Sequence, residues 1–490
     1  MSILKPKRNL YGVQLITYPD SLAGDLTGLR RTIDTHFDGL FTGIHILPFY
    51  PSSGDRGFAP LTYFDVEPAF GDWSHVKALG ESHDLLADIM VNHISAKSAY
   101  FQDYLQKGEA SAYADYFVPL TKIWADGQPV QADIDQMFLR RQTPYSTYQG
   151  ADADVTVWTT FGKEEPSQQV DLDTNAPAVR QFFAECFEHF AKQGINMVRL
   201  DAVGYVVKKL GTSCFFVEPE IDTFLHWIAD LAKQHDILLL PEVHSHYSIQ
   251  YKLSKMGFWI YDFILPFRIL EALVTKQAHM LADYLITRPT NQFTMLDCHD
   301  GIPVKPDLDD LITVAQARVV SEYCQSNGGN FSLIVSDEHK GEDGFDVHQI
   351  RGTFYSLLGC DDNAYIAART LQLFTPGIPQ VYYVGLLAGE HDEAAVARTG
   401  EGREINRHNF TELEIEQAMS KAVVQRLHKL VHFRNSHAHL FDPTVMAFSV
   451  THTDTTLTLE WAGGGEKVTA TIDLVANTST IQTNNQTWEV

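Results

Sequence analysis

Three apolar segments of this sequence each lead to a carboxylate, which is the pattern expected of buried strands that deliver acids into a cleft. The acids, with the segments that carry them, are Asp201 in 197–201, Glu242 in 237–242 and Asp300 in 292–300. A buried carboxylate is costly unless it is paired or used. Three of them at the ends of successive strands therefore indicate a shared acidic site.

The three acids suit the cleavage of a glycosidic bond with retention of configuration. Such a reaction needs a nucleophilic carboxylate on one face of the sugar and an acid/base carboxylate about 5 Å away that protonates the leaving oxygen. Asp201 and Glu242 can fill these roles, and Asp300 can hold the sugar hydroxyls more strongly as the ring flattens toward an oxocarbenium ion. Any one of the acids could instead be a helix cap or a solvated strand end, but the three together favour function.

Length and charge exclude several classes of protein. A chain of 490 residues that is 44% hydrophobic can bury one large core with room for a smaller appended domain. It contains 37 basic and 62 acidic residues, and its net charge of −25 argues against nucleic acid or an anionic membrane as a partner.

We expect a cytoplasmic protein without a cofactor or a metal. Residues 1–8 carry charge but no apolar core of a signal peptide, and no uncharged apolar stretch of about 18 residues occurs. The five cysteines are widely spaced and lack the paired spacing of zinc ligands. Reduced, mostly buried thiols are therefore expected.

Short apolar runs alternate with longer amphipathic stretches, which is typical of βα units around a parallel sheet. Eight parallel strands close into a (β/α)8 TIM barrel whose active site lies at the C-terminal ends of the strands, where all three acids fall. The predicted fold class is therefore α/β. The predicted strands are 12–16, 43–47, 87–91, 197–200, 237–240, 258–261, 293–296 and 380–384.

Two long gaps and a change of pattern divide the chain. The aromatic, turn-rich gap after the third strand predicts an inserted domain, and the gap after the seventh, with an acidic patch at 337–344, predicts a smaller insertion. Near the C-terminus, alternating residues flank a glycine run at 463–465, which predicts a hairpin rather than a phosphate loop because no helix follows. The predicted domains are the barrel at 1–93, 172–303 and 353–436, the insertions at 94–171 and 304–352, and a β domain at 437–490.

At these motifs the sequence resembles the α-amylase superfamily and, within it, the sucrose phosphorylase group. The four strand-end motifs of the superfamily occur in order at 88–93, 198–201, 242–244 and 296–300. The resemblance runs nearly from end to end. Marks of the narrower group are residues 13–18, 45–49, 211–215, 376–385 and 402–408.

The resemblance implies a double displacement. Asp201 would attack the anomeric carbon of an α-glucoside, Glu242 would protonate the leaving fructosyl oxygen, and inorganic phosphate would then take the glucosyl group. Arg199, on the same strand face as Asp201, is expected to hold that carboxylate ionised and aimed. The expected partners are a small sugar and inorganic phosphate, and a homodimer is a candidate assembly because members of the group are often dimers.

The resemblance also implies a pocket for one glucose. His93 and His299 match a pair of family histidines that bind glucose hydroxyls. Asp55 matches an aspartate that clamps the far edge of the glucose, and Phe58 is expected to be a platform for the ring. Arg407 is expected to pair with Asp55 and so to close the pocket to long glucans.

Phosphate must be bound beside acids that repel it, so nearby cations are required. The first insertion offers Arg140 and Arg141, either of which is a candidate contact unless the pair is a solvated turn. His244 is expected nearby, and the second insertion offers His348 and Gln349.

His348 leaves the acceptor open. Group members that act on sucrose usually have an aromatic hydroxyl at this place, whereas members that act on sucrose 6-phosphate tend to carry histidine there. Sucrose and its 6-phosphate are therefore both candidate substrates. The alternatives are a glucosylglycerol or glucosylglycerate phosphorylase, an α-glucoside hydrolase or transglucosidase, and an inactive binding protein, which would be expected to have lost at least one of the three acids.

Overall fold

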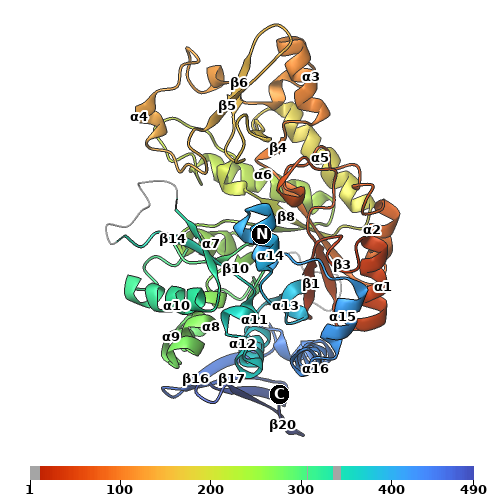
Figure 1. Ribbon diagram of the computed structural model, residues 1–490, viewed down its shortest axis with the longest axis vertical. Helices are drawn as coiled ribbons and strands as arrows, with labels where there is room; N and C mark the ends of the chain where they lie inside the picture. Colours follow the sequence, from red (N-terminus) through yellow and green to blue (C-terminus); the bar gives the residue numbers. More distant parts are fainter. Residues whose placement is uncertain (1–10, 306, 335–343) are drawn as a thin grey trace.

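The centre of the protein is an eight-stranded parallel sheet whose strand order is β10-β11-β15-β1-β2-β3-β8-β9. This computed structural model describes residues 11–305, 307–334 and 344–490. The end strands β9 and β10 also contact each other, which closes the barrel (Figure 1). The strands are β1 (Gln14–Thr17), β2 (Gly43–Ile46), β3 (Asp84–Met90), β8 (Met197–Asp201), β9 (Leu238–Pro241), β10 (Ile260–Asp262), β11 (Gln292–Thr294) and β15 (Ile378–Tyr382).

All eight predicted strands overlap a strand of this sheet, so the predicted α/β barrel is confirmed. The strands are apolar without strict alternation because parallel strands are covered on both faces. In β3, for example, every residue is buried.

Helices cover the outside of the barrel (Figure 1). Those that follow the first six strands are α1 (Leu26–His36), α2 (Trp73–Gly80), α5 (Pro177–Lys192), α6 (Glu220–Gln234), α7 (Tyr247–Lys255), α8 (Leu265–Thr275) and α9 (His279–Thr287). Those that follow β11 and β15 are α10 (Val314–Ser326), α11 (Phe354–Leu357), α12 (Asp362–Phe374), α13 (Tyr383–Leu386), α14 (Glu393–Thr399), α15 (Glu412–Met419) and α16 (Ala422–Ser436).

The long segment after β3 stands at one end of the molecule (Figure 1). Its two ends meet in an antiparallel pair, β4 (His93–Ser95) with β7 (Gln169–Asp171). Between them lie α3 (Ala99–Lys107), α4 (Gln131–Ile134), β5 (Tyr145–Tyr148) and β6 (Val155–Trp158). A second small core, which includes Trp124 and Trp158, fills this segment. We therefore propose residues 94–171 as a domain of their own.

A small antiparallel sheet follows β11. It consists of β12 (Ile302–Pro303), β14 (Val347–Arg351) and β13 (Asn330–Leu333), in that order. The acidic patch expected here falls mostly on residues 335–343, which lie outside the described residues.

The C-terminal segment is a five-stranded antiparallel sheet at the opposite end of the molecule (Figure 1). The hairpin of β17 and β18 turns through Gly464 and Gly465, whose positive φ angles of 61° and 87° suit glycine. The expected β domain and its hairpin are confirmed. The strands are β16 (Ala447–His452), β17 (Thr456–Gly463), β18 (Glu466–Asp473), β19 (Thr478–Thr483) and β20 (Thr487–Glu489).

Trp461 joins this sheet to the barrel. Its side chain is fully buried, and its Nε1–H donates a 2.8 Å hydrogen bond to the carbonyl of Phe374, the last residue of α12. Carbonyls at a helix C-terminus have no partner within the helix. Within the described part of the chain, no helix is long and apolar enough to cross a membrane.

We predict that Trp461→Phe lowers the free energy of unfolding by about 1–3 kcal/mol, because the buried Phe374 carbonyl loses its donor. Denaturant unfolding followed by fluorescence and circular dichroism measures the loss. The matched control is Trp488→Phe, which changes a half-buried tryptophan of the same sheet. An equal loss in both variants would contradict the role of the Trp461 hydrogen bond.

Candidate active site

The three acids meet at the C-terminal ends of their strands and line one cavity of about 120 Å³. Asp201 is the last residue of β8, Glu242 follows β9, and Asp300 lies in the loop after β11. The short loops between strand and acid fix the three carboxylates on the barrel frame. The other expected site residues that line this cavity are Asp55, Phe58, His93, Arg140, His244, His299, His348 and Gln349.

Arg199 lies beneath the acids and is almost fully buried. Its Nη1 donates hydrogen bonds to Asp88 and, at 2.9 Å, to Oδ1 of Asp201. Its Nη2 lies 3.6 Å from Oε1 of Glu242. Asp88 is held in turn by His45, whose Nε2 is 2.7 Å from Oδ2. One guanidinium therefore links three carboxylates.

Asp201 and Glu242 share protons as a pair. Burial and the charges of Glu242, Asp88 and Asp300 raise the pKa of Asp201 to about 8, although Arg199 opposes them. Against its burial, the pKa of Glu242 is lowered to about 2 by His244 and Arg199. This distribution leaves the proton on Asp201, whereas the expected roles require it on Glu242. Burial and mutual repulsion disfavour two charges on neighbouring carboxylates, so the pair of Asp201 and Glu242 holds one proton.

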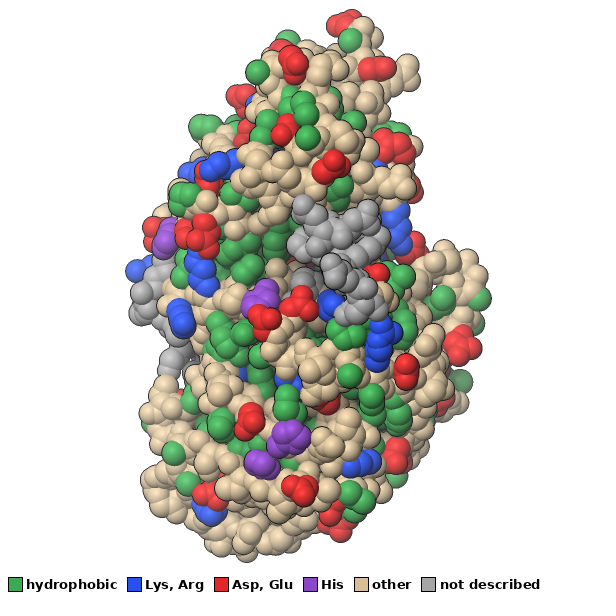
Figure 2. Space-filling view, turned by 90° about the vertical axis from the view of Figure 1, so that its left-hand side faces the viewer, with side chains coloured by type: hydrophobic (Ala, Val, Ile, Leu, Met, Phe, Trp, Pro, Cys, Tyr) green, Lys and Arg blue, Asp and Glu red, His purple; other side chains and the backbone are tan. Residues whose placement is uncertain are grey.

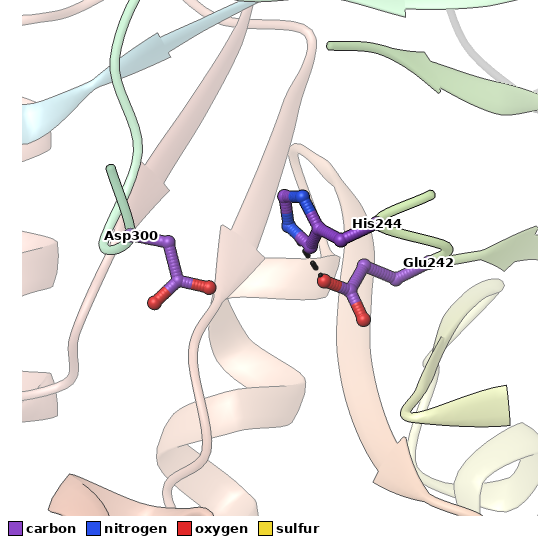
Figure 3. A group of neighbouring side chains, drawn as sticks. All are labelled: Glu242, His244 and Asp300. Atoms are coloured by element: carbon purple, nitrogen blue, oxygen red, sulfur yellow. Dashed lines mark ion pairs between the residues drawn. The ribbon is translucent and has the colours of Figure 1, made fainter. Parts of the chain in front are cut away.

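His244 connects Glu242 to a second buried acid that the sequence analysis missed. Its Nε2 lies 2.9 Å from Oε1 of Glu242, and its Nδ1 lies 3.9 Å from Oδ1 of Asp307. Figure 3 shows the contact with Glu242 and the position of Asp300 across from it. Burial lowers the pKa of His244, but Glu242 and Asp307 together raise it above its ordinary value. Burial and Glu242 raise the pKa of Asp307 to about 7.

Asp300 is surrounded by cations. Arg403 lies 3.2 Å and Arg407 3.8 Å from its Oδ1. Although burial raises the pKa of Asp300, Arg403, His299 and Arg407 hold it well below its usual range. Asp300 therefore stays ionised. Arg403 was quoted from the sequence only as part of a motif and had no expected role of its own.

The expected ion pair between Arg407 and Asp55 is not formed among the described residues, and this prediction is corrected. Arg407 makes its ion pairs with Asp300 and, at 3.5 Å, with Glu404, because these acids lie closer. Asp55 still acts on it from a longer distance. Although burial opposes the change, Tyr18, Asp300 and Asp55 raise the pKa of Arg407.

The sugar-facing histidines are neutral. Nε2 of His93 donates to the carbonyl of Phe58 at 3.0 Å, which leaves its buried Nδ1 as an acceptor without a partner. The ring of Phe58 stacks on His299 with centroids 5.1 Å apart. Burial, Arg199 and Arg407 lower the pKa of His299 to about 3, although Asp300 opposes them. A hydroxyl donor can therefore be bound here without proton exchange.

The expected cationic patch of His348 and Arg140 contains one cation. Nδ1 of His348 lies 2.7 Å from the carbonyl of Lys305, and a carbonyl can only accept, so Nδ1 carries the proton. Nε2 then accepts from Nη1 of Arg140 at 3.4 Å. Burial, Arg140 and His244 lower the pKa of His348 to about 3. His348 therefore orients Arg140 and adds no charge.

Arg141 lies away from the cavity. Its Nη1 donates hydrogen bonds of 2.7 Å to Ser146 and Thr159, and its Nη2 pairs with Glu165. These contacts tie β5 to the segment that follows β6. Of the two neighbouring arginines, only Arg140 lines the cavity.

Aromatic and amide side chains that the sequence analysis did not single out complete the wall. Tyr205 contacts Phe161 and Phe215 with ring centroids 5.0 and 4.8 Å apart. These residues come from separate loops and follow no periodic pattern. The additional lining side chains are Phe161, Gln169, Tyr205, Phe215 and Arg403.

Glu242, His244 and Asp300 each offer a ligand atom, all within 4.8 Å of one another, so this group could hold a metal ion. Arg199 and Arg403 already lie beside two of these acids, at 3.6 and 3.2 Å. Because arginines already balance the charge of these acids, proton transfer can account for the chemistry without a metal. The absence of a metal requirement stays a prediction.

Comparisons with known proteins give one consistent result. The family model for the α-amylase catalytic domain matches residues 11–288. A sucrose 6(F)-phosphate phosphorylase of Thermoanaerobacterium thermosaccharolyticum is 59% identical over 427 residues, which cover 87% of this chain and 88% of that protein. A sucrose phosphorylase of Streptococcus mutans is 42% identical over 477 residues, 96% and 98% of the two chains. A crystal structure of sucrose 6F-phosphate phosphorylase from Thermoanaerobacter thermosaccharolyticum has a TM-score of 0.96 and 54% identity and covers 98% of both chains.

We predict that His348 stays neutral, with its proton on Nδ1, from pH 5 to pH 8, because its pKa is lowered to about 3. Nitrogen-15 spectra of ring-labelled histidines measure both the charge and the tautomer. The His348→Gln variant identifies the signal by its loss. A His348 ring that gains a second proton near pH 6.5, the ordinary histidine value, would contradict this assignment.

Proposed function

We propose that this chain, which belongs to the α-amylase family and to its sucrose phosphorylase group, transfers a glucosyl group from a sucrose-type glucoside to inorganic phosphate. The products are α-glucose 1-phosphate and fructose, or fructose 6-phosphate. The observation that carries this proposal is the single small cavity in which Asp201, Glu242 and Asp300 face Arg140.

In the first step, a carboxylate oxygen of Asp201 attacks the anomeric carbon and forms a glucosyl ester. The bond to the fructosyl oxygen breaks, and Glu242 gives its proton to that oxygen. The pair starts with the single proton that this step needs, and the 2.9 Å hydrogen bond from Arg199 favours the charge on Asp201. Asp300, ionised beside Arg403, stabilises the positive charge that develops on the ring.

In the second step, an oxygen of phosphate attacks the anomeric carbon from the face that fructose has left. The ester bond breaks, Asp201 is released as carboxylate, and Glu242 takes the proton of the attacking phosphate. Two inversions give net retention. Arg140 supplies the charge for phosphate, and His244 lies beside Glu242 on the same side of the cavity.

The far end of the cavity supports a substrate with one glucose. Phe58, His93 and His299 line the cavity. Arg403 and Arg407 form ion pairs with Asp300. An α-glucan hydrolase or transglucosidase needs an open groove for further sugar units. The small volume of the inner cavity, about 120 Å³, therefore favours the phosphorylase over this alternative.

As the glucosyl donor we propose sucrose 6-phosphate as the preferred substrate and sucrose as the second candidate. Among the described residues, no carboxylate forms an ion pair with Arg140, whose guanidinium contacts His348 and lines the cavity. The likeness to a sucrose 6(F)-phosphate phosphorylase supports the same order. Since His348 is neutral, plain sucrose is not excluded by charge.

We further propose a cytoplasmic location, which the five free thiols support because cysteines stay reduced in that compartment. A small sugar and phosphate are the partners. The expected homodimer stays a prediction.

We predict that Asp201→Asn abolishes both phosphorolysis and glucosyl transfer, because no covalent intermediate can form. Glu242→Gln should fail on sucrose but still react with α-glucosyl fluoride, whose leaving group needs no protonation. Rates of fluoride release and of glucose 1-phosphate formation distinguish the two roles. Activity of Asp201→Asn above about a hundredth of wild type would contradict the role of Asp201 as nucleophile. A Glu242→Gln enzyme that reacts no faster with the fluoride than with sucrose would contradict the role of Glu242 as acid.

We predict that phosphate-dependent release of glucose 1-phosphate is fastest, as kcat/KM, with sucrose 6-phosphate, then sucrose, and slower with glucosylglycerol and glucosylglycerate. A charge-assisted hydrogen bond is worth about 1.5–3 kcal/mol, so Arg140→Gln should reduce the preference for the 6-phosphate about 10- to 100-fold. Arg141→Gln is the matched control and should leave the ratio unchanged. A wild type that prefers sucrose, or equal losses in both variants, would count against the proposed acceptor.

A further inference from the structure

A larger cavity of about 490 Å³ adjoins the inner one on its outer side. The two cavities share lining residues from the first insertion, the second insertion and the loop after β15, so a ligand that leaves the inner cavity on this side meets the outer one. The shared residues are Asp55, Arg140, Phe161, Gln169, His348 and Arg403.

The outer cavity is basic in a chain whose net charge is −25. Acidic side chains are spread over the whole length of the face in Figure 2. Against four acidic lining residues, Asp55, Glu164, Glu401 and Glu404, the cavity gathers six basic side chains. They are Arg56, Arg140, Lys163, Arg351, Arg403 and Arg407.

Part of this charge is neutralised within the cavity. Lys163 forms an ion pair with Glu401, and Arg407 forms one with Glu404. Arg56 lies 3.4 Å from Asp20. Arg403 pairs with Asp300 of the inner site at 3.2 Å. Among the described residues no carboxylate forms an ion pair with Arg351, on which Asp300 and Glu401 act only from a longer distance.

Arg351 is held in place but incompletely bonded. It is the last residue of β14. Its Nη1 packs so closely on Gly402 that a Cβ atom added to this glycine would lie 2.5 Å from it. Among the described residues, its buried Nε–H has no hydrogen-bond partner, and neither has Nη2 of Arg407. Burial, and after it the like charges of Arg403 and Arg407, lowers the pKa of Arg351, although Asp300 and Glu401 oppose the change. A bound anion would relieve both deficits.

We propose that Arg351 and Arg403 form an anion site in the outer cavity that holds a phosphate group before it enters the inner cavity. The site is separate from the contact at Arg140. This inference rests on the proposed function, in which the glucosyl ester must meet phosphate before it meets water. A basic cavity raises the local concentration of a dianion and its association rate, by about 10- to 1000-fold in steered systems.

The shared chemistry is a phosphate dianion, which can come from inorganic phosphate or from the phosphate of a sugar substrate. The two sources are separated by kcat/KM for inorganic phosphate with sucrose as donor, and by kcat/KM for sucrose 6-phosphate relative to sucrose.

The test compares wild type with Arg351→Gln, Arg351→Lys and the control Arg30→Gln, which alters a half-exposed arginine of α1. In Arg351→Gln we expect a loss of about 10-fold in kcat/KM for inorganic phosphate at low salt, a weaker salt dependence, and a larger share of hydrolysis. Arg351→Lys should retain most of the rate because it retains the charge. Release of fluoride from α-glucosyl fluoride, which measures formation of the glucosyl ester, should not change.

A loss confined to sucrose 6-phosphate would support the anion site and assign it to the sugar phosphate. An Arg351→Gln enzyme within twofold of wild type in both arms, or an equal loss in Arg30→Gln, would overturn the site. A wild type that forms the glucosyl ester but no glucose 1-phosphate would instead overturn the proposed function, whatever Arg351 does.

Discussion

The guanidinium of Arg199, buried inside the barrel, is the interaction on which the site depends. It bonds Asp88 and Asp201 and lies 3.6 Å from Glu242. Without this cation, three buried acids would repel one another in a medium of low dielectric constant. With it, one negative charge and one proton can coexist on Asp201 and Glu242, which is the state that a retaining glycosyl transfer requires.

The barrel and its insertions divide the work. The barrel strands carry the acids on short loops, so their separation is fixed by the sheet. The proposed acceptor side consists of Arg140 from the first insertion and His348 from the second, which meet at 3.4 Å although 208 residues separate them. A phosphorylase can in this way vary its acceptor without disturbing the chemistry, since the two sets of residues lie on different elements.

Histidine charge is set by position throughout the site. His244, beside two acids, has a raised pKa, whereas His299 and His348, buried beside arginines, have pKa values lowered to about 3. The side of the cavity proposed to bind phosphate therefore combines the fixed cation Arg140 with the neutral ring of His348 and with His244, whose pKa is raised. Such an arrangement can bind phosphate or a hydroxyl without a large electrostatic cost next to Asp300.

The sequence by itself determined the eight strands, the C-terminal hairpin and the acids Asp201, Glu242 and Asp300, because these follow from local periodicity and from the charge that ends each apolar run. It did not determine which of Arg140 and Arg141 faces the cavity, or that Arg407 pairs with Asp300. It also missed Asp307, Tyr205 and Arg403. Adjacent residues have the same local pattern but opposite surroundings, and contacts between loops far apart in the chain leave no periodic signal. Those choices were made only by the tertiary structure, where distance and burial decide the partner and the charge of each group.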